Sequence, residues 1–113
     1  IPLYGEIFAL MEGYTLNTFI ADTVRVYGGA WVGDCAQVSG NAYICGNAYI
    51  SDNAKVCDHA QVYGRVTISG NAIVRGNAVL FGNVNVYENV LLEGNVTISS
   101  GSVWDIYWWK DIP

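Results

Sequence analysis

The chain is poor in charge, in proline and in histidine. It has 5 basic residues against 10 acidic ones, which gives a formal net charge of −5, and it has only 2 prolines and 1 histidine. Proteins that grip nucleic-acid phosphates need a basic patch, so this balance argues against a nucleic-acid partner. Charged residues make up 13% of the chain and hydrophobic residues 52%, which is the opposite of the composition of a disordered segment.

Long apolar runs and cysteine motifs are missing as well. Because no run of about 18 apolar residues occurs, we expect no membrane-spanning helix and no membrane partner. The cysteines are Cys35, Cys45 and Cys57, an odd number without a Cys-x-x-Cys pair. This pattern argues against a disulfide framework and against a zinc site.

What the chain has in abundance is a repeat of six residues. From residue 18 to residue 101 it divides into consecutive hexads without an insertion or deletion, as in Ala36–Asn41 (AQVSGN) and Ala72–Asn77 (AIVRGN). The first position is mostly Ala or Val, and the third is Val, Ile or Leu. The fifth is mostly Gly or Asp, and the sixth is mostly Asn.

The type of residue at each hexad position has a physical explanation. Residues two apart point to the same side of a strand, so the first and third positions predict an apolar inner row and the second and fourth an outer one. Gly and Asn at the fifth and sixth positions tolerate the positive φ that we expect at a sharp corner. One such short strand cannot bury its apolar side alone, but stacked parallel coils can.

The hexad resembles the repeat of the hexapeptide-repeat family, most clearly in Val38–Ala42 (VSGNA) and Ile68–Ala72 (ISGNA). The resemblance implies a left-handed parallel β-helix with three hexads in each triangular coil. The "GNA-x-V" style is most similar to uninterrupted repeat proteins of bacteria and phages, which are often assigned as acyltransferases. We therefore predict an all-β solenoid of four to five coils, of bacterial or phage origin.

The two ends do not follow the hexad. We expect residues 1–17 to form an N-terminal cap, as a short amphipathic helix or an irregular plug, and residues 102–113 to form an aromatic C-terminal cap. The N-terminal stretch has no basic start and carries Glu6 and Glu12, unlike a signal peptide. We therefore favour the cytoplasm or a phage particle as the location.

With three hexads per coil, residues 18 apart stack and the outer positions form three faces. The least polar face predicts an interface, most plausibly that of a homotrimer such as the family resemblance implies. The alternative is that aromatic and β-branched residues simply suit strands. The predicted anchors, on this face, on a neighbouring face and in the C-terminal cap, are Tyr27, Tyr43, Tyr63, Val79, Phe81, Trp31, Trp104, Trp108 and Trp109.

His59 is the candidate for catalysis. The resemblance implies that a histidine acts as general base toward an acyl-CoA, in a pocket shared between subunits. However, His59 occupies a corner position, where histidine tolerates positive φ, and no loop interrupts the hexads to build a pocket. We therefore favour a structural role for His59.

Asp34 and Asp52 stack at the fifth position of one corner and are candidates for a cation site. Aspartate is also an ordinary turn residue, and two carboxylates alone make a weak site, so we expect no metal. Cys45 and Cys57 fall on different faces, so we expect no intrachain disulfide.

The sequence as a whole favours a non-catalytic scaffold or binding module without a cofactor, self-associating or binding a protein partner through its flat faces. The first alternative is an acyltransferase that uses acyl-CoA, with His59 as base. The second is a structural protein that assembles end to end into filaments.

Overall fold

The computed structural model describes residues 18–104 and 109–110, and within them every regular element is a β-strand. The described residues include no helix that could span a membrane. The strands are β1 Phe19–Ile20, β2 Arg25–Val26, β3 Trp31–Val32, β4 Gln37–Val38, β5 Tyr43–Ile44, β6 Tyr49–Ile50, β7 Lys55–Val56, β8 Gln61–Val62, β9 Arg65–Ile68, β10 Ile73–Val74, β11 Val79–Tyr87, β12 Leu91–Glu93, β13 Thr97–Trp104 and β14 Trp109–Lys110.

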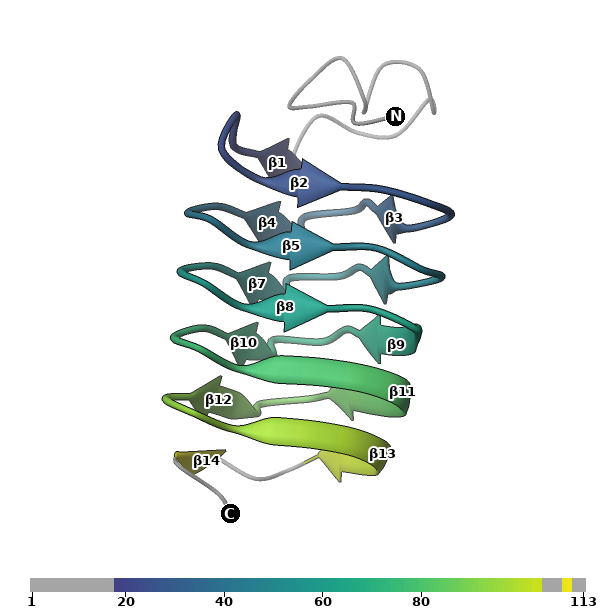
Figure 1. Cartoon of the computed structure of the whole chain (residues 1–113), viewed down its shortest axis with the longest axis vertical. Helices are drawn as coiled ribbons and strands as arrows, with labels where there is room; N and C mark the ends of the chain where they lie inside the picture. The colour runs from purple at the N-terminus through teal and green to yellow at the C-terminus, as the bar shows by residue number, and fades with distance from the viewer. Residues whose placement is uncertain (1–17, 105–108, 111–113) are drawn as a thin grey trace.

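The strands stack in parallel columns from coil to coil (Figure 1). One sheet runs β1-β4-β7-β10-β12-β14, and we call its outer surface the β1 face. The β2 face carries β2, β5, β8 and the first part of β11, and the β3 face carries β3, β6, β9 and the second part of β11. These two faces belong to one sheet because β11 runs around the corner between them.

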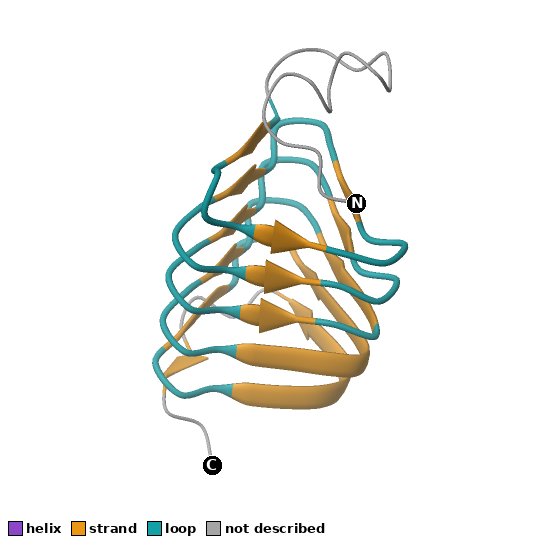
Figure 2. Cartoon of the chain, turned by 45° about the horizontal axis from the view of Figure 1, so that its top comes forward, coloured by secondary structure: helices purple, strands orange, loops and turns teal. Residues whose placement is uncertain are grey.

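The coil is left-handed and three-sided. On the near side of Figure 1, β2, β5 and β8 run from left to right, and the chain descends one coil at a time. Figure 2, in which the top of the molecule is turned toward the viewer, shows the same succession of strands and corners around the coil axis. The predicted all-β parallel solenoid of about five coils is confirmed.

The interior is filled by the first and third positions of the hexads. Two inward residues of one coil, Ala42 and Ile44, have no exposed surface. The same holds for Ala60 and Val62, which stack on them in the next coil. Each fully buried Val, Ile or Leu contributes roughly 1.5–3 kcal/mol through the hydrophobic effect. Small Ala and larger aliphatic side chains alternate along most of each inner row, so aliphatic side chains fill most of the narrow interior.

The described corners take their positive φ at the fifth hexad position, except in the last hexad, where the sixth residue Gly101 has it (101°). The residues other than glycine with positive φ are all acids at this position: Asp34 (55°), Asp52 (58°), Asp58 (62°) and Glu88 (65°). Between them, glycines such as Gly40 (67°) and Gly46 (71°) fill the same position. No described asparagine at the sixth position takes a positive φ, so one left-handed residue turns the chain at these corners.

The last described coil departs from the 18-residue spacing. Thr97 and Ile98 pair with Val79 and Leu80, but after a register shift Ser100 lies opposite Asn83 and Gly101 opposite Val84. The prediction of regular spacing up to Gly101 is therefore wrong by one residue at this corner. Parallel pairing continues past Gly101 to Trp104, opposite Tyr87.

The predicted N-terminal cap at residues 1–17 lies outside the described residues, as does most of the C-terminal cap after Trp104. Within that cap, the backbone of Trp109 and Lys110 forms β14 and pairs in parallel with Leu92 and Glu93 of β12.

Candidate functional site

Aromatic side chains gather on both sides of the corner between the β2 and β3 faces. On the β2 face, Tyr63 and Phe81 stack with ring centroids 5.4 Å apart, one coil above the other. Tyr27 meets Tyr43 edge to face at 5.6 Å. The fifth positions of this corner are all glycine, namely Gly28, Gly46, Gly64 and Gly82, and its sixth positions include Gly29, Asn47 and Arg65. We call the aromatic residues that flank it, Tyr27, Tyr63, Phe81, Trp31 and Tyr49, the aromatic corner.

On the β3 face, Trp31 stacks on Tyr49 with centroids 4.5 Å apart and planes at 12°. The indole also lies over Gly33, where an added Cβ would come within 2.1 Å of the ring. Gly33 therefore makes room for Trp31 to lie flat on the strand. Further along the same face, Tyr87 stacks with Trp104 at 6.3 Å.

The predicted anchors are thus spread over two adjoining faces. Val79 lies half-buried on the β2 face, in the column of Tyr43. Tyr27, Tyr43, Tyr49 and Trp104 keep 36–49% of their surface exposed. Trp108 and the side chain of Trp109 lie outside the described residues.

His59 lines an open depression of about 450 Å³ where the β1 and β2 faces meet. Two columns of side chains form its walls: Thr23, Asn41 and His59 from the sixth hexad position, and Arg25, Tyr43 and Gln61 from the second. His59 sits in the column where the sequence placed it. Its backbone N–H donates to the carbonyl of Gly76, as expected for a corner residue in a stack.

The Tyr43 phenol of this depression has a raised pKa. The neighbouring Cys45 thiol, through charge repulsion and a hydrogen bond, raises the pKa of the Tyr43 phenol above its ordinary value. The phenol therefore stays protonated at neutral pH and can donate a hydrogen bond.

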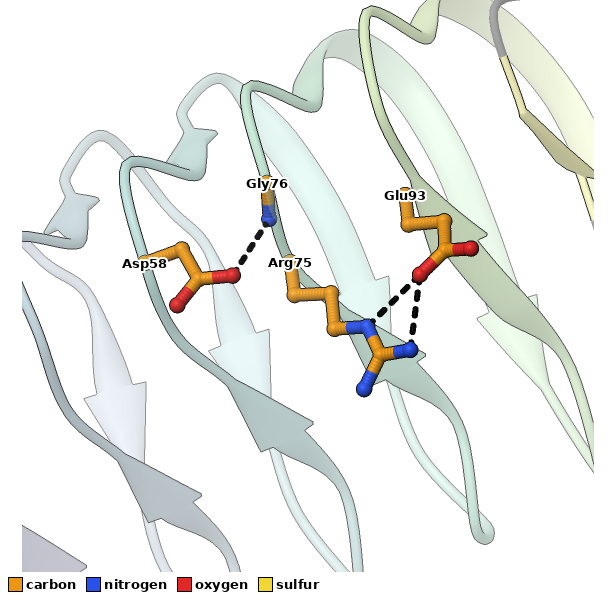
Figure 3. Close-up of polar contacts among 4 residues, drawn as sticks. All are labelled: Asp58, Arg75, Gly76 and Glu93. Carbon is orange, nitrogen blue, oxygen red and sulfur yellow. Dashed lines mark hydrogen bonds and ion pairs between the residues drawn. The ribbon is translucent and has the colours of Figure 1, made fainter.

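The corner aspartates accept hydrogen bonds from the backbone of the next coil. The Asp52 carboxylate accepts a hydrogen bond from the N–H of Gly70 at 3.0 Å, and the Asp34 carboxylate accepts one from the N–H of Asp52 at 3.3 Å. Asp58 accepts one from the N–H of Gly76 at 3.0 Å (Figure 3). Each acid thus caps the same corner of the next coil, and the described residues include no cluster of three metal-binding side chains.

The β1 face carries an ion pair and a half-buried thiol. Arg75 of one coil reaches Glu93 of the next, with Nε to Oε1 at 2.8 Å and Nη2 to Oε1 at 2.7 Å (Figure 3). This hydrogen bond raises the pKa of Arg75. Cys57 lies on the same face, and burial together with the nearby Asp58 raises the pKa of its thiol. All three cysteines are free thiols.

Comparison with known families supports the repeat architecture. A family model described as YdcK Beta solenoid repeat matches residues 60–76. This segment covers β8, β9 and β10, which is one complete coil, so the match agrees with a β-solenoid repeat protein. Comparison with curated proteins and with solved structures gave no significant match. The hexapeptide-repeat resemblance and the acyltransferase activity that it implies stay predictions.

Sequence reasoning found His59 and Tyr43 but did not bring them together in one depression. The sequence pattern contains the information needed to predict this depression. Residues 18 apart stack, and the sixth position of one hexad and the second position of the next are separated by a single inward residue. Arg25, Asn41 and Gln61 follow from that rule once the two columns are considered together.

Proposed function

We propose that this chain is a non-catalytic β-solenoid module that self-associates, as a homotrimer, through its aromatic corner. The observation that carries the proposal is the set of stacked, partly exposed rings on either side of one glycine-rich corner. Aromatic side chains are enriched at the centres of protein interfaces because they bury a large area at a low entropic cost.

Two further features support a scaffold role. The interior is filled by aliphatic side chains, and no described coil extrudes a loop, so a ligand has only the outer surfaces to bind. Cross-strand hydrogen bonds link every coil to the next and hold the outer rows in fixed register. Such a rigid, flat surface loses little entropy when it meets a partner.

Light scattering coupled to size exclusion tests the proposal. We expect a mass three times the 12.3 kDa of one chain. Phe81→Ser should lower this mass toward that of one chain, because Phe81 lies in the aromatic corner. Phe19→Ser is the matched control, since Phe19 is 51% exposed but lies on the β1 face.

A single-chain mass for the unchanged protein would contradict self-association. A trimer that survives Phe81→Ser, with melting curves showing both variants folded, would contradict the choice of surface.

The depression around His59 favours a second candidate function, the acyltransferase that uses acyl-CoA. Arg25 and Tyr43 lie beside His59, so a base, a cation and a phenol share one surface. If His59 is the base, acetyl-CoA should raise the melting temperature of the protein, and His59→Ala should abolish acyl transfer. Absence of any acetyl-CoA effect on the folded protein would exclude this candidate.

A further inference from the structure

The depression between the β1 and β2 faces has an unusual chemistry for this acidic chain. Its six lining side chains offer a guanidinium, an imidazole, two carboxamides, a phenol and a hydroxyl, and none of them is a carboxylate. The chain as a whole has a net charge of −5. A surface that collects hydrogen-bond donors and excludes acids suits an anionic ligand.

The depression is a consequence of the hexad geometry. Between the sixth and second positions the chain places one residue, Val24, Ala42 or Ala60, whose side chain is buried in the core. Only backbone therefore lies at the floor, while the flanking side chains stand outward as walls. The floor is shallow and continuous over three coils because parallel pairing keeps Arg25, Tyr43 and Gln61 in register.

Four of the six side chains have no polar partner in the part of the chain that the structure describes. Within residues 18–104 and 109–110, the side chains of Arg25, Asn41, His59 and Gln61 form no hydrogen bond or ion pair with another described residue. Thr23 differs, since its hydroxyl donates to the carbonyl of Gly40.

The same two columns change character in the next coils. There the Asn77 carboxamide donates to Asn95 at 3.4 Å, and the second position becomes the apolar Val79. The amides thus satisfy each other below the depression and stay open within it. This contrast confines the donor-rich surface to the first three described coils.

We propose that this depression binds a small, hydroxylated organic oxyanion, either a carboxylate or a phosphate ester. Arg25 offers a planar fork that matches an oxyanion with two parallel hydrogen bonds. Asn41 and Gln61 each combine a donor and an acceptor, which suits hydroxyl groups on the body of the ligand. The depression does not include the aromatic corner, so a test of ligand binding and a test of self-association can give different outcomes.

Two acids lie near the depression in sequence, and neither lines it. Asp58 precedes His59, but one of its carboxylate oxygens accepts the N–H of Gly76 in the following coil (Figure 3). Asp22 precedes Thr23 at the corresponding place of the first coil and is exposed. The nearest fixed charge within the depression is therefore that of Arg25.

Isothermal titration with three ligands that share one sugar ring tests the proposal. We expect glucuronate or glucose 6-phosphate to bind at millimolar concentrations, and neutral glucose to bind at least about tenfold more weakly. Tighter binding of glucuronate identifies a carboxylate site, and tighter binding of glucose 6-phosphate identifies a phosphate site.

Arg25→Gln should weaken binding of the preferred anion by about tenfold or more, because the charge-assisted hydrogen bonds are lost. Arg65→Gln is the matched control: it removes the same charge from an exposed corner position outside the depression, and binding should not change. Thermal melts verify that both variants are folded. Equal binding of glucose, equal loss in both variants, or no binding of either anion would overturn the proposal.

Discussion

At the fifth position of most hexads, the backbone takes a positive φ and the next coil lies directly against it. A Cβ added to Gly46 would come within 2.6 Å of the backbone nitrogen of Gly64. Asp34, Asp52 and Asp58, which hold this position in other hexads, offset the strain by accepting a backbone hydrogen bond, which alanine cannot do. Glycine therefore fits this position because it has no Cβ, and aspartate fits it because its carboxylate accepts a hydrogen bond.

We predict that Gly46→Ala lowers the free energy of unfolding by roughly 1–3 kcal/mol, because alanine is strained at a φ of +71° and meets backbone that cannot move aside. Urea denaturation measures the loss. Gly29→Ala is the matched control at the sixth position of the same corner, one coil earlier. Gly29 lies outside the positive-φ range, and its nearest neighbour is the Asn47 side chain at 3.0 Å. An equal loss in both variants would show that crowding, rather than φ, limits the corner.

The Cys57 thiol gives a prediction for alkaline pH. Its pKa is raised in the folded protein, chiefly by burial. Below the unfolded-state pKa both states hold the thiol proton, and as pH rises past it the unfolded state ionises first. The free energy of unfolding should therefore fall between about pH 8 and about pH 10. Urea denaturation of Cys57→Ala should show a smaller fall over this range, and an identical fall would contradict the assignment.

At the scale of the strand and its corner, contacts repeat from one coil to the next. Asn71 donates to Asn89 at 3.3 Å, and Arg75 pairs with Glu93, in each case 18 residues along the chain. The ion pair is solvent-exposed, so it contributes little to stability. We expect each aspartate hydrogen bond to stabilise the fold more than this ion pair does. The reason is that a charged carboxylate accepts from a backbone N–H, such as that of Gly70 or Gly76.

Substitutions at Asp52 test the cap. We predict that Asp52→Ala lowers the free energy of unfolding by roughly 1–2 kcal/mol, because the acceptor for the Gly70 N–H is lost while the positive φ remains. Asp52→Asn keeps an acceptor and should cost less, and Asp52→Gly regains conformational freedom and should also cost less than alanine. Thermal and urea unfolding of the three variants would refute the cap if alanine and asparagine were equally destabilising.

At the scale of the whole molecule, each coil contacts only its neighbours, so stability propagates along one axis. A coil with partners on both sides buries its aliphatic row fully, whereas the first described coil does so incompletely. Val62 has no exposed surface, while Val26, in the same column two coils earlier, is only half-buried.

This difference predicts unequal costs for one chemical change. Val62→Ala should lower the free energy of unfolding by about 2–3 kcal/mol, and Val26→Ala by less than about half of that. Amide hydrogen exchange should likewise be slowest in β5 to β10 and faster in β2. Equal costs for the two valines would mean that the first coil is as well supported as the central ones.

The sequence by itself determined the period, the inner and outer rows and the parallel stacking, because these depend on the local alternation of strand residues repeated every six positions. It also placed His59, Asp52 and the aromatic residues in their columns. Tertiary structure decided how neighbours within and between columns meet. Trp31 lies over Gly33, Tyr27 turns toward Tyr43, and the last coil slips by one residue at Leu80 and Asn83. These outcomes depend on side-chain rotamers and on the space left by adjacent coils, which a repeat pattern does not encode.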